Sequence, residues 1–102
     1  MKVLYHIGEE IGSETIVKRG LIDEKISPLK LVAEDEIVFN DIQSIDFYKL
    51  NGLGTMIKLK NGADTIFLAV PRLYLNIGTG FAIINYFATK KLKNILELGI
   101  KS

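Results

Sequence analysis

The sequence predicts a mostly β domain in which about six or seven short antiparallel strands precede one long C-terminal helix. Strand-like runs alternate with Asn51-Gly52 and Asn61-Gly62, and both residue types tolerate the positive φ angles of a tight type I′ hairpin turn. Residues 36–71 are therefore expected to form a three-stranded meander. After Pro71 the apolar residues recur at spacings of three and four, which is the pattern of an amphipathic helix.

In order along the chain, the expected strands are Val3–Ile7, Glu14–Asp23, Leu29–Ala33, Glu36–Phe39, Ile42–Leu50, Thr55–Lys60 and Asp64–Val70. In the second strand we expect Ile16 and Leu21 to face inward, with a bulge or bend at Gly20. Leu29 and Leu31 share one face of the third strand, and Ile45 and Phe47 share one face of the fifth.

The last two strands of the meander have the clearest patterns. In Thr55–Lys60, Ile57 and Leu59 are expected to point inward while the intervening lysines point outward. The segment Asp64–Val70 is nearly all apolar, which predicts a central strand covered on both faces.

The helix is expected over Gly80–Leu98, with Thr79 as its N-cap and Gly99 as its stop. Lys90, Lys91 and Lys93 would then lie toward its C-terminal end, where cations complement the helix dipole. The residues of its predicted apolar stripe are Phe81, Ile84, Ala88, Leu92 and Ile95.

The totals predict a single domain over residues 1–102, with 48% hydrophobic and 25% charged residues. The chain has no cysteine, which excludes disulfides and thiolate metal sites and suits a reducing cytoplasm. The stretch Leu73–Thr89 is uncharged, but it is too short and too polar for a membrane span.

Charge is distributed unevenly along the chain. Residues 1–50 hold six Lys/Arg against ten Asp/Glu, whereas residues 51–102 hold seven against two, and the net charge is +1. This asymmetry indicates complementary faces between subunits or a basic patch on the C-terminal element, unless the charges intermix on folding.

No catalytic constellation is visible, and we expect no enzyme, cofactor or metal. His6 is the single histidine, and no cysteine accompanies it as a ligand. Ser13, Ser27 and Ser44 have no nucleophile elbow around them. Nucleic acid is not expected as a partner, because aromatic residues interleaved with basic ones are missing.

The runs IVKRGLI, LKLVAEDEIVFNDIQSI, GTMIKLKNG and DTIFLAVPR, followed by the terminal helix, are similar to the pleckstrin-homology (PH) superfold. The resemblance covers Thr15 to Leu98 and is greatest to the small PH-like domains of bacteria and archaea. It implies a partly open barrel of seven strands capped by one helix, with residues 1–14 outside it as an extra N-terminal strand.

The same resemblance implies that basic residues on early strands grip anionic headgroups, and the candidates here are Lys18, Arg19 and Lys30. Asp23 and Glu24, in the comparable loop, would oppose such a ligand. Lys90, Lys91 and Lys93 are the candidates for contact with an acidic membrane, to which each lysine contributes about 1 kcal/mol.

We therefore expect a non-catalytic, cytoplasmic PH-like binding or scaffolding module that associates with itself and with a protein partner. The apolar stretch Leu73–Thr89 and the charge asymmetry favour self-association. The alternatives are a membrane-surface module that binds anionic lipid and, third, a small-ligand carrier or enzyme with a cavity beneath the helix.

Overall fold

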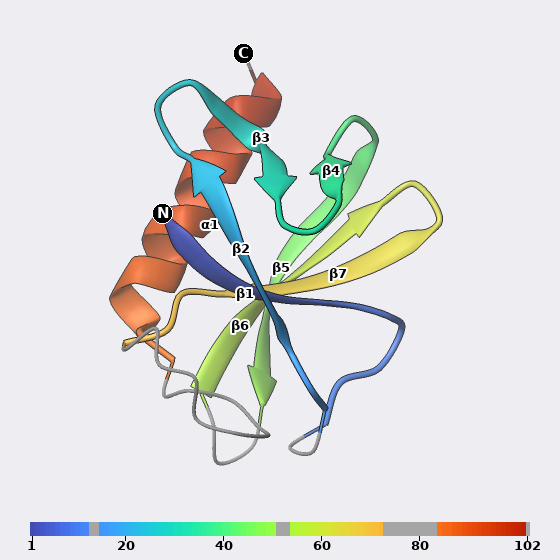
Figure 1. The fold of residues 1–102 in the computed structure, drawn as a ribbon, viewed down its shortest axis with the longest axis vertical. Helices are drawn as coiled ribbons and strands as arrows, with labels where there is room; N and C mark the ends of the chain where they lie inside the picture. Colours follow the sequence, from blue (N-terminus) through green and yellow to red (C-terminus); the bar gives the residue numbers. More distant parts are fainter. Residues whose placement is uncertain (13–14, 51–53, 73–83, 102) are drawn as a thin grey trace.

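A computed structural model describes residues 1–12, 15–50, 54–72 and 84–101, and it confirms the mostly β fold class (Figure 1). Seven antiparallel strands form one sheet in the order β4-β3-β2-β1-β7-β6-β5, which curls through 197° into a half-barrel. The strands are β1 (Lys2–Ile7), β2 (Lys18–Asp23), β3 (Ser27–Val32), β4 (Glu36–Val38), β5 (Ile42–Leu50), β6 (Gly54–Asn61) and β7 (Asp64–Ala69). The single described helix is α1 (Tyr86–Lys101), and it packs against β3, β5 and β6.

The predicted meander is present, since β5, β6 and β7 pair consecutively. The turn between β6 and β7 differs from the type I′ prediction. Asn61 is the last residue of β6 and pairs with Asp64. Of the two residues between them only Gly62 (φ 59°) has positive φ, as a type II′ turn requires. The Asn61 side chain instead accepts from the Asp41 N–H (2.9 Å) and donates to the Val38 carbonyl (3.2 Å). Asn51-Gly52 lies outside the described residues.

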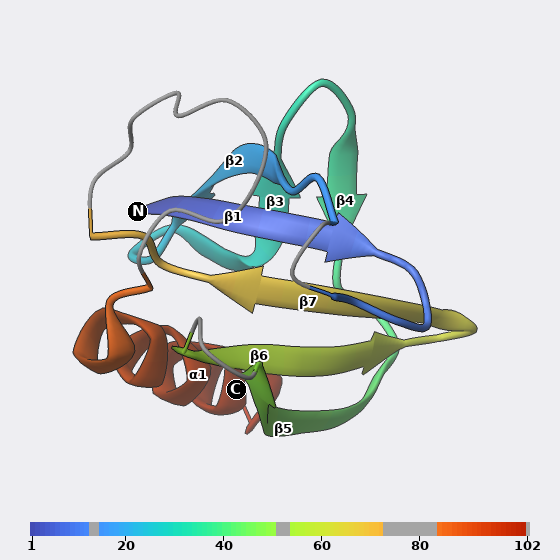
Figure 2. The same cartoon turned by 90° about the horizontal axis from the view of Figure 1, so that it is seen from below.

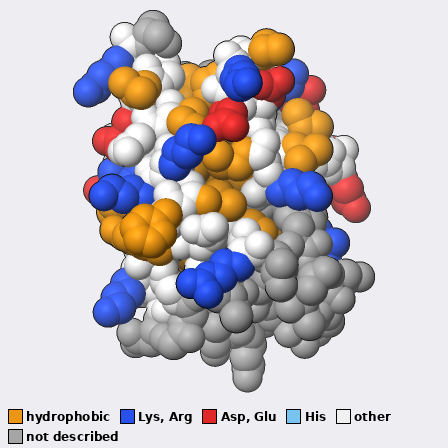
Figure 3. All heavy atoms as spheres, turned by 90° about the vertical axis from the view of Figure 1, so that its left-hand side faces the viewer, with side chains coloured by type: hydrophobic (Ala, Val, Ile, Leu, Met, Phe, Trp, Pro, Cys, Tyr) orange, Lys and Arg blue, Asp and Glu red, His pale blue; other side chains and the backbone are white. Residues whose placement is uncertain are grey.

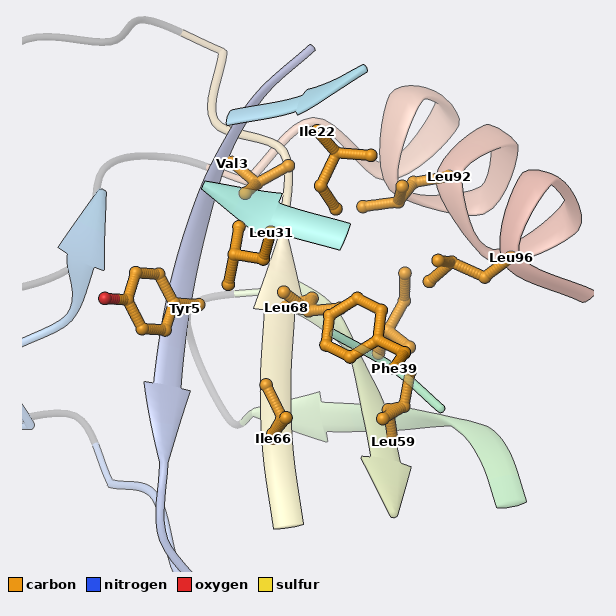
Figure 4. Packing of buried hydrophobic residues seen from close by; sticks show 11 residues of the cluster. Val3, Tyr5, Ile22, Leu31, Phe39, Leu59, Ile66, Leu68, Leu92 and Leu96 are labelled. Atoms are coloured by element: carbon orange, nitrogen blue, oxygen red, sulfur yellow. The ribbon is translucent and has the colours of Figure 1, made fainter. Parts of the chain in front are cut away.

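Strand β7 is covered on both faces, as its apolar sequence predicted. Ile66 and Leu68 belong to the core on the concave face, beneath α1, while Phe67 and Ala69 belong to a second cluster on the convex face. Figure 4 shows Leu92 and Leu96 of α1 pointing into the concave core, toward the side chains of the sheet. The buried members of this core are Val3, Tyr5, Ile22, Leu31, Phe39, Ile57, Leu59, Ile66, Leu68, Leu92 and Leu96.

Strand β2 is shorter than predicted, and its inward face was wrongly assigned. Ile16 precedes the strand and is 69% exposed, and Leu21 is 51% exposed, while Ile22 is fully buried. Gly20 forms no bulge with β1; the register shifts between Ile22 and Asp23 instead. A Cβ on Gly20 would lie 2.7 Å from Leu31 Cδ1, so glycine is needed there for close packing between β2 and β3.

The helix begins later and ends later than predicted. Asn85 caps it, because its Oδ1 accepts from the Ala88 N–H (3.1 Å), and the preceding Ile84 forms a β-bridge with Pro71. Thr79 and Gly80 lie outside the described residues, and so does Phe81 of the predicted stripe. Of the remaining stripe, Leu92 is buried and Ala88 and Ile95 are half-buried.

Gly99 does not stop the helix, which continues to Lys101. A Cβ on Gly99 would lie 3.1 Å from Leu29 Cδ2, so this glycine lets the last turn of α1 approach β3 closely. Thr89, which the sequence pattern did not single out, is fully buried, and its Oγ1 accepts from the Val70 N–H at 3.0 Å. This bond ties the first turns of α1 to the end of β7.

Candidate docking surfaces

The basic residues predicted to contact anions lie on three separate elements. Lys18 and Arg19 are exposed at the start of β2, and Lys30 lies within β3. Lys90, Lys91 and Lys93 lie on α1, but in its N-terminal half, so the predicted complement to the C-terminal dipole is wrong.

Lys30, Lys91 and Lys93 have acidic partners. Nζ of Lys30 lies 3.2 Å from Glu36 Oε1, and Nζ of Lys93 lies 2.9 Å from Glu97 Oε1. Lys91 is a looser partner of Glu24, at 3.7 Å. A site that grips a phosphate needs cations free to converge on it, and these three are already drawn to carboxylates.

The described part of the chain contains no group of three or more metal-ligating side chains. His6, the single histidine of the sequence, stacks on Phe67 with ring centroids 6.3 Å apart. Its Nε2 lies 3.1 Å from the Glu10 carbonyl oxygen. Among the described helices, none combines the length and the apolar character that crossing a bilayer requires.

The half-barrel is open along a seam between its outermost strands, β4 and β5, each of which pairs with one neighbour only. The C-terminal turns of α1 lie over this seam, as the contacts of the helix with β3 and β5 indicate. Unpaired backbone N–H and C=O groups at a sheet edge are available for hydrogen bonds to another chain.

Three hollows follow one another around the end of α1, with volumes of about 250, 340 and 310 Å³. The first and second share Ile42 and Ile100, and the second and third share Leu29 and Gly99, so together they form one continuous depression, the seam groove. Its other lining residues are Ser27, Pro28, Lys30, Val38, Phe39, Asn40, Asp41, Gln43, Ser44, Ile45, Glu97 and Lys101.

The seam groove combines apolar and polar lining residues. Its floor is aliphatic, and its rim holds the exposed side chains of Ser44 and Gln43 together with both charge signs, Glu97 and Lys101. Gln43 falls at a register shift between Ile42 and Ser44, which breaks the regular pairing of β5 with β6 at this point. The groove can accept apolar side chains of an extended partner segment.

A second surface lies at the opposite end of α1. Tyr86 and Phe87 in its first turn are 44% and 81% exposed, and Phe47 on β5 is 43% exposed. The rings touch, with centroids 6.2 Å apart for Phe47 and Tyr86 and 5.6 Å apart for Tyr86 and Phe87. Lys93 Nζ lies 4.9 Å from the centroid of the Phe47 ring.

Figure 3 views the side of the molecule on which α1 lies, and exposed apolar side chains alternate there with lysines. This surface was not predicted, because Tyr86 and Phe87 fall in the middle of the helix expected over Gly80–Leu98 and not in its first turn. The signal was present: Phe87 shares a helix face with the polar residues Lys91 and Asn94 and lies outside the predicted apolar stripe.

Fold and surfaces together define a curled antiparallel β protein with a capping helix and two partly apolar surfaces that are candidates for docking. Comparison of the chain with known protein families, curated proteins and solved structures finds no match.

Proposed function

We propose that this protein is a non-catalytic, PH-like binding and scaffolding module of the cytoplasm that takes a partner protein in the seam groove and associates with its own copies. The observation that carries the proposal is the groove itself, where an aliphatic floor meets the free edge of β5. The curled antiparallel sheet and the capping helix are compatible with the PH superfold without being diagnostic of it. Residues 1–14, which the resemblance left outside the barrel, supply its central strand, β1.

The groove favours a partner segment in extended conformation. A strand added beside β5 would form main-chain hydrogen bonds, and every second side chain would point toward Ile42, Ile45 and Ile100. Burying two aliphatic side chains of such a partner contributes about 3–6 kcal/mol, before the costs of association are subtracted. Binding is therefore expected to be weak to moderate and to depend on alternate apolar residues.

The test uses a displayed library of random peptides, selected on the immobilised full-length protein. Enriched peptides should carry apolar residues at alternate positions, and the synthetic peptide should shift the backbone NMR signals of Ser44, Ile45 and Ile100. Ile100→Lys, which keeps a residue suited to a helix C-terminus, should lose this binding. Failure to enrich any peptide, or shifts confined to other surfaces, would refute the proposal.

A matched control is Ile16→Lys, which also places a lysine on an exposed isoleucine. Its segment, just before β2, lies at the end of the molecule opposite the C-terminus of α1 (Figure 1). This variant should bind the selected peptide as the unmodified protein does, because the seam groove is unchanged.

Anionic membrane is the second candidate partner. Phe87, exposed beside Lys90 and Lys91, combines an apolar side chain able to enter the headgroup region with cations that attract acidic lipid. Flotation with acidic liposomes at low and physiological salt tests it: salt-sensitive binding that is lost in Lys90/Lys91/Lys93→Glu supports it, and no binding at either salt excludes it.

A further inference from the structure

Two exposed patches of opposite charge lie on opposite faces of the molecule. The first, the aromatic-lysine patch, comprises Phe47, Tyr86, Phe87, Lys90 and Lys91. Lys90 lies one helical turn from both Tyr86 and Phe87, and Lys91 lies one turn from Phe87, so the cations border the rings. The first turn of α1 contains no acidic residue, and the partner of Lys91 in the turn after β2, Glu24, lies at the loose distance of 3.7 Å.

Exposure of three touching aromatic rings indicates an interface, because such a patch is costly to leave in water. The bordering lysines restrict what can cover it. Two copies that met through this same patch would bring lysine against lysine, and like charges across an interface oppose association. The fitting partner surface is apolar with an acidic border.

The chain itself carries a surface of that kind, the acidic-apolar patch, made of Leu21, Val32, Glu34, Asp35 and Glu36. Leu21 lies directly opposite Val32, and Val32 lies directly opposite Glu36, so all three side chains share one face of the sheet. Leu21 and Val32 are 51% and 45% exposed.

This face is the convex one. The neighbouring inward positions are filled by Gly20, Ile22 and Leu31, which are buried against the concave core. Glu34 and Asp35 form the turn after Val32, and within the described residues neither has an ion pair. Glu36 is held by Lys30, and Lys2 lies opposite Leu21 at the other border of the patch.

The two patches point away from each other. In Figure 2, α1 and β5 lie at the bottom of the molecule, and the turn between β3 and β4 is at the top. A contact between the aromatic-lysine patch of one copy and the acidic-apolar patch of another therefore leaves one unused patch at each end of the pair. Such a heterologous contact adds further copies, as an open chain or a ring, and does not stop at a two-fold dimer.

We propose that this protein assembles head to tail, with Phe47, Tyr86 and Phe87 of one copy covering Leu21 and Val32 of the next, and with Lys90 and Lys91 facing Glu34 and Asp35. This inference rests on the self-association in the proposed function, and it specifies which surfaces meet and that the contact is heterologous. Each patch is small compared with the about 20–30 residues per side of a standard interface, so assembly is weak and depends on concentration. Added salt weakens it further, because its charges lie at the border of the contact.

The test is analytical ultracentrifugation of the full chain over a concentration series, at low and at high salt. One variant, Lys90→Glu/Lys91→Glu, reverses the first patch, and a second, Glu34→Lys/Asp35→Lys, reverses the other. Each alone should weaken association by about tenfold or more. Both change exposed residues, and circular dichroism confirms that they remain folded.

The decisive sample is an equal mixture of the two variants. Each variant retains one intact patch, and the two reversed patches are complementary to each other, so the mixture should again assemble beyond the dimer, with the two variants alternating. A two-fold contact through one patch would stop at dimers in the same mixture. A chain with all four substitutions should assemble again, because its charges are exchanged rather than removed. Phe87→Ser should weaken assembly without changing its salt dependence.

Three results would overturn the inference. If neither variant weakens the oligomers, the protein associates with itself through a surface other than these two patches. A strict monomer at high concentration and low salt would remove self-association altogether, while peptide capture by the seam groove would be unaffected. A monomer that floats with acidic liposomes, and loses that binding in Lys90→Glu/Lys91→Glu, would assign the patch to a membrane.

Discussion

The hydrogen bond from the Val70 N–H to Thr89 gives the sharpest test of how α1 is attached to the sheet. Thr89→Val keeps the shape of the side chain and removes its only hydrogen-bond acceptor. Thr89 is fully buried, and the bond is partly buried, so the Val70 N–H would lose its partner where water reaches it poorly.

The size of the effect follows from two opposing terms. Leaving a buried N–H without a partner costs about 1–3 kcal/mol. The additional methyl group of valine returns up to about 0.8 kcal/mol of hydrophobic stabilisation. With the mid-range cost of about 2 kcal/mol, the free energy of unfolding should fall by about 1–2 kcal/mol, which for a chain of this size lowers Tm by roughly 4–16 °C.

Urea unfolding followed by circular dichroism measures the stability, and native-state hydrogen exchange measures the Val70 amide itself. Thr89→Ser is the matched control: it keeps the hydroxyl and loses a methyl group, so it should lose about 0.8 kcal/mol while the Val70 amide stays protected. The reasoning is refuted if Thr89→Val is as stable as the unmodified protein, or if its Val70 amide exchanges no faster.

Two further substitutions test local structure by urea unfolding. Asn85→Ala removes the cap that accepts from the Ala88 N–H and should cost about 0.5–2 kcal/mol, while Asn85→Asp should retain most of that stability; equal losses would mean that the cap is not the cause. Gly20→Ala should cost about 1–3 kcal/mol, because the new Cβ would meet Leu31 at 2.7 Å and the backbone beyond it. Gly99→Ala is the matched comparison and should change stability little, because the gain of about 1 kcal/mol in helix propensity offsets a milder contact at 3.1 Å. An equal loss of stability at both glycines would contradict the stated difference in packing.

The strands were predictable where burial alternates cleanly. In β6, Ile57 and Leu59 are fully buried between exposed lysines, and the apolar run of β7 is covered on both faces. Period-two patterns depend on the strand alone, so they can be read locally. The same reasoning failed for Leu21, which was predicted to face inward but is exposed. The inward position before it is Gly20, and a glycine adds no apolar side chain to the alternating pattern.

The helix start was predicted too early because the hydroxyl of Thr79 suits an N-cap, whereas the described helix is capped by Asn85, six residues later. Gly99 was wrongly predicted to end the helix, because glycine occurs both at helix C-termini and where a helix packs closely on another element. Here it allows the close approach of α1 to Leu29.

The exposure of Phe87 could have been predicted from the helix pattern, but the full extent of both surfaces could not, because each surface joins separate elements. The seam groove joins Leu29, Ile42 and Ile100, which the curl of the sheet brings together from distant parts of the chain. The aromatic-lysine patch likewise joins Phe47 to Tyr86 across separate elements.

The position of β1 at the centre of the sheet has a consequence for the order of folding. One edge of β1 pairs with β2, which soon follows it, but the other edge pairs with β7, whose residues come about sixty positions later. The hairpins β2–β3 and β3–β4 can form locally, whereas the two halves of the sheet cannot join until β7 is available. Until then the free edge of β1 is a site where a nascent chain can mispair, so the rate of productive folding should be set by closure of this long loop.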